Sequence, residues 1–312
     1  MTPLLDVIVV NWHAGEQLLT CLRSVLAAEQ KGYRLDRVIV IDNASSDGSI
    51  DRVEALCPSI IRIRNTENRG FAAACNQGAV GSRADFILFL NPDTRLFSDT
   101  LCKPIVFLDR PENSDVGVVG VQLVDDAGHV HRSCARFPTA GRELAMMLGL
   151  DRLAPRLFTT HFMTEWDHSD SREVEQVMGA FFLVRRAVFE ALDGFDERFF
   201  VYFEDVDFAL RARRRGWRSF YLATAHAYHR GGGTSAQAKD LRLFYALRSR
   251  IRYCFKHFGW VEAALVTAAT LLVEPVCRVA WALVRRSPDE ALDTLRAYAR
   301  LWREVPTLLG TA

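Results

Sequence analysis

The sequence predicts an α/β fold, in which helices flank a doubly wound, mostly parallel sheet and a helical appendage follows at the C-terminus. Short, nearly continuous apolar runs alternate with helical segments over residues 1–125, the pattern of strands that are buried on both faces and joined by crossover helices. From residue 239 onward the pattern is helical. We therefore expect a sheet domain at residues 1–238 and a helical region at residues 239–312.

The first part of the chain supplies the parallel strands. Mostly apolar runs predict strands at residues 7–10, 38–41, 60–63 and 86–90. Apolar residues at helical spacing predict a helix over residues 18–28, and small residues mark another over residues 72–81. A short helix is expected after the turn-rich loop 42–49. Parallel strands joined in this way require right-handed crossovers.

The signals beyond residue 115 are more varied. The pattern predicts a hairpin over 116–130, an irregular excursion over 137–175, a strand over 177–184, a helix over 204–215 and a strand over 217–222. Gly216 is expected to stop the helix.

Composition and motifs exclude several functions. The formal net charge is +1, so bulk electrostatics gives no case for nucleic acid binding. The sequence has neither a G-x-G-x-x-G after its first strand nor a G-x-x-x-x-G-K-[ST], which are the dinucleotide and P-loop signatures. The seven cysteines form no C-x-x-C pair and are expected to be reduced core residues of a cytosolic protein. The first apolar run ends at Asn11 without a basic segment before it, and predicts a strand rather than a signal peptide.

The stretch Asn91-Pro92-Asp93 ends a buried strand and is the first candidate site. Pro92 cannot donate to a sheet ladder, so the chain turns there and leaves Asp93 at the carboxyl edge of the sheet. Ligands of open α/β sheets bind at that edge. Oxygen ligands such as these suit Mg²⁺ or Mn²⁺ holding a diphosphate. An ordinary turn is the alternative, since Asn, Pro and Asp all favour turns.

Asp42 ends the second predicted strand, and Asp205 opens a predicted helix in the run Glu204-Asp205-Val206-Asp207. A carboxylate at Asp42 can accept hydrogen bonds from a nucleobase or a ribose, or can cap a turn. The positive end of the helix favours an ionised Asp205, which among the aromatic residues before it is a credible base for an alcohol nucleophile. Acidic residues are also common in first helical turns for structural reasons alone.

His229 precedes three glycines, residues 231–233, and is the last candidate. A neutral imidazole there can complete a metal site begun by Asp93. The glycines allow the loop to close over a diphosphate with its amides turned inward. His226, three residues earlier, is an equal candidate on spacing alone.

Taken in order, these stretches resemble the family 2 inverting glycosyltransferases of the GT-A fold, and within them the bacterial rhamnosyltransferase-like branch that builds cell-surface polysaccharide. The resemblance covers residues 5–235. Each stretch is weakly specific, and eight in the family's order are highly specific. The matching stretches are residues 7–12, 40–49, 68–76, 88–93, 179–186, 194–200, 203–207 and 229–233.

The resemblance implies a role for each candidate residue. It implies that the nucleotide sugar is bound by Asn11, Asp42, Asn68, Arg69, Asn91 and Asp93. It also implies that Asp93 and His229 bind Mg²⁺ or Mn²⁺. On the acceptor side it implies Gly179 and Glu204, with Asp205 as the catalytic base. The sequence departs from the family's Asp-x-Asp metal motif, because Asn91 replaces the first Asp. The Asn-Pro-Asp form is familiar in the rhamnosyltransferase-like branch, but a neutral amide is a poorer metal ligand. Whether Asn91 contacts the metal or the nucleotide alone is left open.

The implied reaction moves a sugar from a nucleoside-diphosphate donor to a hydroxyl of a glycan or a polyprenyl-diphosphate-linked sugar, with inversion at the anomeric carbon. The branch resemblance implies rhamnose from dTDP-rhamnose. A UDP-hexose donor and a non-catalytic sugar-nucleotide-binding protein are the alternatives, and the presence of Asp93, Asp205 and His229 argues against the second. A sugar nucleotidyltransferase would need a Gly-rich, basic loop after the first strand, which residues 11–16 do not supply.

The helical region lies outside the resemblance. Basic residues flank the apolar stretch 258–284, which includes Trp260 and Trp281, and this pattern suits helices on an anionic membrane surface. Packing on the sheet domain or a homodimer contact is the alternative. The apolar run 263–273 is shorter than the roughly 20 residues that span a bilayer, and a longer run is interrupted by Glu262, Glu274, Pro275 and Arg278. We expect a cytoplasmic protein, peripheral on the inner face of the cell membrane if these helices bind lipid.

Overall fold

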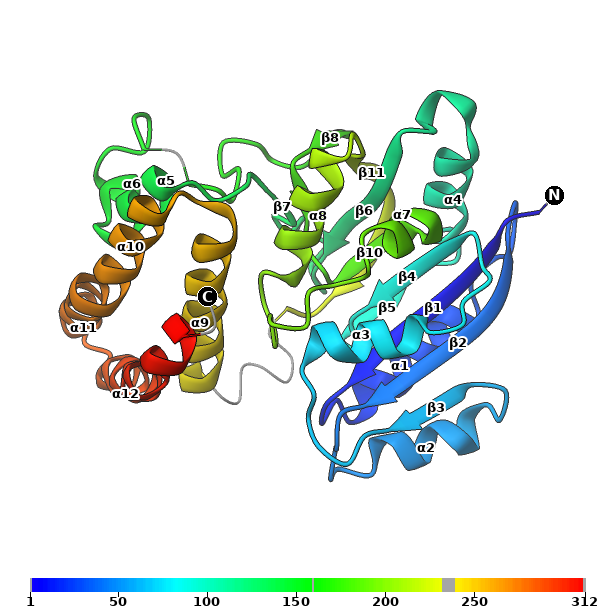
Figure 1. The fold of residues 1–312 in the computed structure, drawn as a ribbon. Helices are drawn as coiled ribbons and strands as arrows, with labels where there is room; N and C mark the ends of the chain where they lie inside the picture. The colour runs from blue at the N-terminus through cyan, green and yellow to red at the C-terminus, as the bar shows by residue number, and fades with distance from the viewer. Residues whose placement is uncertain (1, 159, 232–238, 311–312) are drawn as a thin grey trace.

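The computed structural model describes residues 2–158, 160–231 and 239–310. Figure 1 shows a layered sheet domain and, beside it, a bundle made mainly of the C-terminal helices. The strands are β1 (Leu4–Asn11), β2 (Arg34–Asp42), β3 (Ile61–Arg64), β4 (Phe86–Leu90), β5 (Thr94–Leu96), β6 (Val116–Val124), β7 (Cys134–Ala135), β8 (Arg172–Val174), β9 (Gln176–Val177), β10 (Phe181–Arg185) and β11 (Arg218–His229).

The helices divide between the two bodies. Those that cover the sheet are α1 (Glu16–Leu26), α2 (Ser49–Leu56), α3 (Phe71–Ala79), α4 (Cys102–Asp109), α7 (Arg186–Ala191) and α8 (Glu204–Arg214), with a 3₁₀ turn at Pro111–Asn113. Those of the bundle are α5 (Ala140–Met147), α6 (Leu150–Leu153), α9 (Lys239–His257), α10 (Trp260–Ala268), α11 (Glu274–Val284) and α12 (Pro288–Gly310).

The main sheet has nine strands in the order β3-β2-β1-β4-β10-β6-β11-β5, with β8 paired to β11. β1, β2, β3, β4, β6 and β11 run in one direction, and β5, β8 and β10 run in the other. The predicted α/β class, the mostly parallel sheet and the helical C-terminal region are confirmed. The sequence-based division at residue 238 falls at the edge of a stretch that the structure does not describe, and stays a prediction.

The core has one apolar layer on each face of the sheet. On β1, Val7 and Val9 join the layer that contains α1, whereas Ile8 joins the layer that contains α3. The small residues of α3 allow it to lie close to β1, because a Cβ added at Gly78 would stand 2.6 Å from Ile8 Cγ2. Both faces of the central strands are therefore buried, as their continuous apolar runs require.

Two predicted strand elements take another form. The hairpin expected over residues 116–130 is confirmed only around its turn, where the Gly128 amide donates to the Asp125 carbonyl and Val124 forms an antiparallel bridge with Val130. The rest of β6 lies between β10 and β11 in the main sheet instead of pairing with the returning chain. Eight of the nine residues of β6 are buried, because β6 has a neighbouring strand on each side in the sheet. The strand expected over 177–184 is divided into β9, which pairs with β7, and β10 in the main sheet.

The excursion at residues 137–175 is more regular than expected, because it contains α5, α6 and β8. Met147 of α5 packs with Ala263 and Val266 of α10. The excursion thus joins the bundle, although it precedes the C-terminal helices by about a hundred residues.

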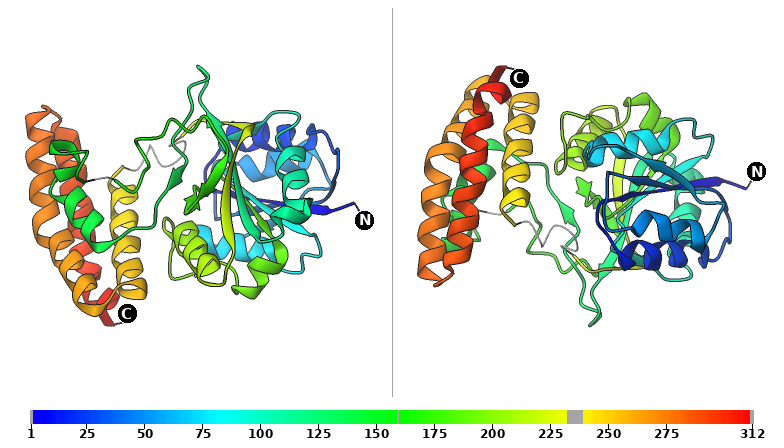
Figure 2. Two further views of the ribbon diagram at one scale, coloured as in Figure 1. Left: turned by 90° about the horizontal axis from the view of Figure 1, so that it is seen from above. Right: turned by 90° about the horizontal axis from the view of Figure 1, so that it is seen from below.

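The C-terminal helices lie side by side next to the sheet domain (Figure 2). The interruption expected at Glu274-Pro275 is wrong, because one continuous helix runs from Trp260 to Val284. A π-helical turn, Ala269–Val273, precedes the proline. This local change of hydrogen-bond pattern lets the helix continue although the proline has no N–H to donate. By length and composition alone, this is the one helix among the described residues that could cross a membrane, with a mean hydropathy of 1.6 over an 18-residue window of which 33% is buried.

Candidate active site

The carboxyl ends of β1 and β2 bring Asn11 and Asp42 together. The two residues are register partners, and Asn11 Nδ2 donates to Asp42 Oδ1 over 2.6 Å. Both side chains are buried, and Asn11 also bonds the hydroxyls of Ser45 and Ser49 at 3.1 and 2.8 Å. Asn11 therefore fixes the orientation of Asp42 and of the loop after β2.

The segment before α3 closes the same end of the sheet. The Asn68 side chain accepts a hydrogen bond from the Gly70 amide at 2.9 Å, and Arg69 is exposed. Gly70 has a φ of 85°, and an added Cβ would meet the Phe200 carbonyl oxygen at 2.4 Å. The Asn43 side chain donates to the Gly70 carbonyl at 3.0 Å. The chain before α3 is thus clamped between the loop after β2 and the loop that precedes α8.

Asp93 and His229 meet because β5 pairs with the end of β11. His229 is the register partner of Thr94, and its Nε2 lies 3.3 Å from Asp93 Oδ1. The two side chains are 9% and 11% exposed, so the pair stands at the edge of solvent rather than inside the core. His226 instead interacts with Asp99. The structure thus selects His229 from the two histidines that spacing alone left equal.

The donor set of this pair fits a divalent cation in part. A carboxylate and an imidazole at this separation are ligands that Mn²⁺ and Mg²⁺ accept. Among residues 2–158, 160–231 and 239–310, no group of three or more His, Cys, Asp or Glu side chains is placed to hold a metal ion. Further ligands would therefore come from outside these side chains, as phosphate oxygens or water. Of the three glycines expected after His229, residues 232 and 233 lie outside the described residues.

Asp205 lies close to Asp93 through a short chain of contacts. The Gly179 amide donates to Asp205 Oδ2 at 2.9 Å, and the next residue, Ala180, accepts a hydrogen bond from the Asn91 amide at 3.0 Å. The break between β9 and β10 thus places the predicted base beside the turn after β4. This explains why the strand expected over 177–184 is interrupted at Gly179.

Two opposing effects act on the Asp205 carboxylate. Burial raises the pKa of Asp205, and the amides of Gly179 and Val206, which donate to its oxygens, lower it. The net direction is upward, so burial outweighs the stabilisation that we expected from the helix end. A carboxylate with a raised pKa is a stronger base than an ordinary aspartate.

The pKa of the neighbouring residue Glu204 is shifted strongly by this environment. Burial, and then the Asp205 charge, raises the pKa of Glu204 well above its usual value. Its Oε2 has no hydrogen-bond partner within the described part of the chain. Tyr202 and Phe203, just before α8, both have positive φ angles, of 66° and 69°. A strained backbone directly before two buried carboxyl groups is typical of a functional site.

The third acid of this helix, Asp207, has a role that sequence reasoning missed. Asp207 Oδ1 lies 2.5 Å from Lys256 Nζ and 2.7 Å from His257 Nε2, and Asp207 Oδ2 accepts from Arg211 Nε at 2.7 Å. Lys256 and His257 belong to α9, about fifty residues away along the chain, and no local pattern pairs them with Asp207. The first turn of α8 is therefore fastened to the C-terminal bundle two residues from Asp205.

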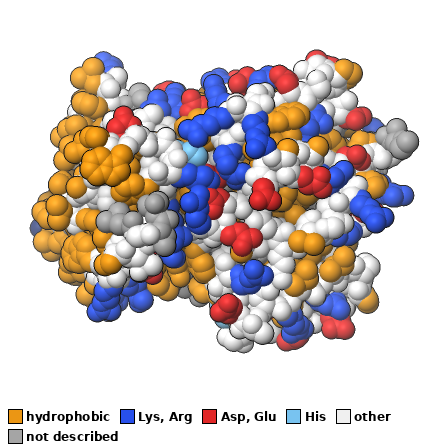
Figure 3. Space-filling view, in the orientation of Figure 1, with side chains coloured by type: hydrophobic (Ala, Val, Ile, Leu, Met, Phe, Trp, Pro, Cys, Tyr) orange, Lys and Arg blue, Asp and Glu red, His pale blue; other side chains and the backbone are white. Residues whose placement is uncertain are grey.

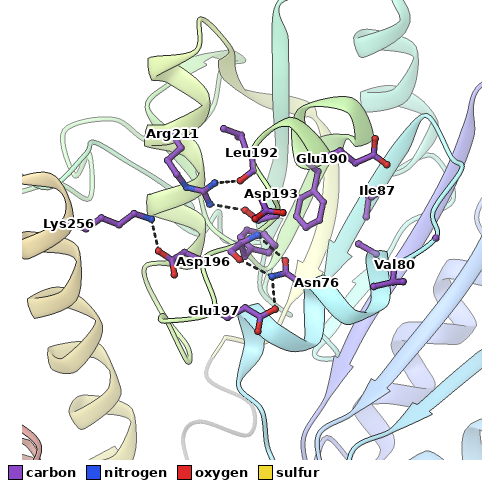
Figure 4. A pocket seen from close by; sticks show the side chains of 15 residues that line it. Asn76, Val80, Ile87, Glu190, Leu192, Asp193, Asp196, Glu197, Arg211 and Lys256 are labelled. Carbon is purple, nitrogen blue, oxygen red and sulfur yellow. Dashed lines mark hydrogen bonds and ion pairs between the residues drawn. The ribbon is translucent and has the colours of Figure 1, made fainter. Parts of the chain in front are cut away.

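A surface pocket of about 720 Å³ lies elsewhere (Figure 4). It is lined by the end of α3, the start of β4 and the segment between α7 and α8, and by none of the predicted site residues. Its polar groups bond one another: Asn76 donates to Glu197, Arg211 donates to the Leu192 carbonyl, and Lys256 donates to Asp196. Among the described residues, none of the buried side-chain polar atoms that lack a hydrogen-bond partner belongs to the lining of this pocket.

The sequence profile of the family described as Glycosyl transferase family 2 matches residues 6–193, which is more than half of the chain. The chain belongs to glycosyl transferase family 2. The resemblance to this family is thereby confirmed. The matched segment contains Asp42 and Asp93 but ends before Asp205 and His229, so it says nothing about those two residues.

Two curated relatives carry the resemblance to the rhamnosyltransferase-like branch. The chain is 28% identical over 280 residues to the N-acetylglucosaminyl-diphospho-decaprenol L-rhamnosyltransferase of Mycobacterium tuberculosis, covering 85% of this chain and 89% of that protein. It is 30% identical over 171 residues to rhamnosyltransferase WbbL of Escherichia coli, covering 54% of this chain and 61% of that protein.

Solved structures show the same fold. The mannosyltransferase PcManGT of Pyrobaculum calidifontis, in complex with GDP-Man and Mn²⁺, has a TM-score of 0.58 at 16% identity, covering 98% of this chain and 88% of that one. TarS residues 1–349 of S. aureus have a TM-score of 0.53 at 14% identity, covering 96% and 91%. The GT-A-type architecture of this glycosyltransferase is thus confirmed.

Proposed function

We propose that this glycosyltransferase moves rhamnose from dTDP-rhamnose to a hydroxyl of a polyprenyl-diphosphate-linked sugar or a growing glycan, in the synthesis of cell-surface polysaccharide. The single observation that carries the proposal is the chain of contacts that runs from Asp205 through the Gly179 amide and the Ala180 carbonyl to Asn91, in the turn that leads to Asp93 and its partner His229. The choice of rhamnose and of a lipid-linked acceptor rests on the two rhamnosyltransferase relatives.

On the donor side, the loop after β2 and the segment before α3 form the nucleoside pocket. Asp42, oriented by Asn11, accepts hydrogen bonds from the nucleoside, while Asn68, Arg69 and Asn91 shape the opposite walls. Asp93 and His229 would hold Mn²⁺ or Mg²⁺, which would neutralise the negative charge of the diphosphate leaving group. Because the donor set is a carboxylate and an imidazole, Asn91 is assigned to the nucleotide rather than to the metal.

On the acceptor side, Asp205 takes the proton from the acceptor hydroxyl while that oxygen attacks the anomeric carbon from the face opposite the leaving group. One bond forms as the bond to the diphosphate breaks, so the anomeric configuration is inverted. The Gly179 amide and the Val206 amide keep the carboxylate oriented. Glu204, whose pKa is raised by burial and by the Asp205 charge, stands beside it on the acceptor side.

Replacing the base tests the proposal directly. Asp205→Asn should lower kcat by about 10²–10⁴, the range for a positioned general base, and should leave donor affinity within a few fold of wild type. Asp289→Asn, an exposed carboxylate of α12, is the control and should not change either value. Kinetics and donor titration separate the two effects, and near-normal turnover of Asp205→Asn would remove Asp205 from the mechanism.

Metal removal tests the Asp93–His229 assignment. Treatment with EDTA should abolish transfer, and added Mn²⁺ or Mg²⁺ should restore it. His229→Ala should raise the metal concentration needed for half-maximal rate by about tenfold or more, because one of two protein ligands is lost. Full activity in EDTA, with unchanged kinetics of His229→Ala, would contradict metal dependence.

The identity of the donor is tested with a panel of sugar nucleotides. Thermal shift and transfer assays with dTDP-rhamnose, UDP-galactose and UDP-GlcNAc should single out dTDP-rhamnose. Transfer from a UDP-hexose alone would reassign the donor while preserving the mechanism. Donor binding without transfer to any lipid-linked or glycan acceptor would favour a non-catalytic binding protein.

A further inference from the structure

The C-terminal bundle presents an apolar stripe to solvent. Val261, Leu265, Leu272, Val276 and Leu283, on the continuous helix of α10, the π-helical turn and α11, are each between 56% and 71% exposed. They follow one another at intervals of four or seven residues, which is one or two helical turns, so they line one side of the helix. Figure 3 shows hydrophobic side chains gathered at the left of the molecule, over these helices.

The neighbouring helix widens this surface. Leu292, Leu295 and Trp302 of α12 are each nearly half exposed. Trp302 Nε1 donates to the Leu271 carbonyl at 3.1 Å, so the tryptophan lies against the helix that carries the stripe. We call these eight side chains the bundle face. Soluble monomers seldom leave a contiguous apolar surface of this extent without a partner.

The charge of the bundle indicates what kind of surface covers the bundle face. Residues 239–312 contain twelve Lys and Arg against seven Asp and Glu, whereas residues 1–238 contain 27 against 31. Arg285 and Arg286 are both exposed at the end of α11. The Arg152 guanidinium stands 5.1 Å above the ring of Trp281 beside them. A second copy of the same face would bring like charge, while an anionic surface attracts this one.

The opposite side of the same helix packs against the rest of the protein. Glu274 is buried, bonds Arg250 and accepts from Arg278 Nε at 2.8 Å. Arg250 also lies 3.6 Å from Glu143 of α5. A helix with one side fixed by buried ion pairs and the other side apolar lies in a membrane interface rather than across it.

We propose that the bundle face docks this protein on the surface of an anionic lipid bilayer, with the Trp260–Val284 helix in the membrane plane. The apolar side chains enter the boundary between headgroups and acyl chains, and the arginines contact the headgroups. The proposal stands apart from the sugar and acceptor assigned above, because membrane binding requires neither, and a binding assay without substrate tests it alone.

Vesicle flotation of the full-length protein is the test. Wild type should float with vesicles of phosphatidylcholine and phosphatidylglycerol, and several-fold less with phosphatidylcholine alone or in high salt. Leu272→Asp combined with Val276→Asp should lower the partition coefficient at least tenfold. Arg285→Glu combined with Arg286→Glu should lower binding to the anionic vesicles only. Val80→Asp is the matched control, since Val80 is apolar and 74% exposed but lies after α3, and it should float as wild type does.

Three results would overturn the proposal. The first is absence of wild-type flotation with anionic vesicles, or equal loss in Val80→Asp. The second is a dimer by light scattering that the Leu272→Asp and Val276→Asp pair dissociates, without vesicle binding, which would assign the face to a second copy. The third is wild-type protein that resists extraction by salt and alkali, which would mean a helix crossing the bilayer. Thermal melts of each variant confirm that its fold is intact.

Discussion

Asp205, the proposed base, lies in surroundings that act on its pKa in opposite directions. Withdrawal from water raises its pKa, while two backbone amides keep the ionised form oriented. Burial, and then the Asp205 charge, raises the pKa of its neighbour Glu204 well above the usual value, so each of the two carboxyl groups opposes ionisation of the other.

The pH dependence of transfer follows from that pair. Only ionised Asp205 accepts a proton, so kcat/KM should fall as the pH drops through its raised pKa, giving an acid limb above the ordinary aspartate value of about 3.9. Glu204→Gln should leave this limb in place, because a neutral amide copies a protonated carboxyl group. A limb that moves to lower pH in Glu204→Gln would show that Glu204 is charged in the working enzyme.

Gly70 is the residue whose backbone holds the donor side together. Gly70→Ala places a Cβ 2.4 Å from the Phe200 carbonyl oxygen in a left-handed conformation, so both strain and steric overlap oppose it. We expect a loss of about 2–4 kcal/mol in unfolding free energy and weaker donor binding.

Gly48→Ala is the matched control for that substitution. Gly48 also has a positive φ, of 68°, but no atom stands within 4 Å of its added Cβ, so only the strain of about 1–2 kcal/mol applies. Urea denaturation measures both losses. Equal losses in the two variants would show that the contact with Phe200 does not constrain this loop.

At the scale of elements, the contact between α8 and α9 connects the helix that carries Asp205 to the bundle. Burial opposes ionisation of Asp207, but the hydrogen bond with His257 and the charges of Arg211 and Lys256 outweigh it and lower the pKa of Asp207. Lys256 also pairs with Asp196, in the segment between α7 and α8. The bundle therefore fixes the start of α8, where Asp205 lies.

Asp207→Asn should destabilise the protein by about 3 kcal/mol at neutral pH, because it leaves basic partners without their carboxylate. The folded-state pKa of Asp207 is lowered, so its stabilisation is present above the unfolded value of about 3.9 and is lost as the pH falls through the folded-state pKa. The difference in Tm between wild type and variant should be constant from neutral to mildly acidic pH and should shrink below about pH 4. A difference that does not change with pH would mean that the Asp207 charge does not stabilise the fold.

Strand β11 shows how an element joins distant parts of the site. It was expected at residues 217–222 and extends to His229, because it pairs with β6 along most of its length and with β5 at its end. β5 has only three residues and no sequence signal of its own. That short pairing nevertheless brings His229 to Asp93.

At the scale of the whole molecule, charge and apolar surface are divided between two bodies. The part that precedes residue 239 carries a net negative formal charge and the active-site candidates, whereas the bundle carries a net positive charge and the bundle face. The contact of α9 with α8 joins the two, and α5, which precedes residue 239 in the chain, packs within the bundle against α10. A protein built in this way can present its catalytic edge while its bundle rests on an anionic surface.

The sequence by itself determined the features that are encoded locally. Continuous apolar runs revealed β1, β2 and β4, because a strand buried on both faces leaves its signature in consecutive residues. The polar residues that end those strands, Asn11, Asp42 and Asp93, could be placed at one edge of the sheet for the same reason.

Only the tertiary structure decided what depends on residues far apart in the chain. Four features join segments that are separated by more than twenty residues. Antiparallel β10 inserts between β4 and β6, and His229 rather than His226 meets Asp93. The Gly179 amide holds Asp205, and α9 holds Asp207. The periodicity of apolar residues shows which face of a segment is buried, but not which other segment packs against that face. The strand ends were therefore predictable one at a time, and the site that they form became visible only when the chain was folded.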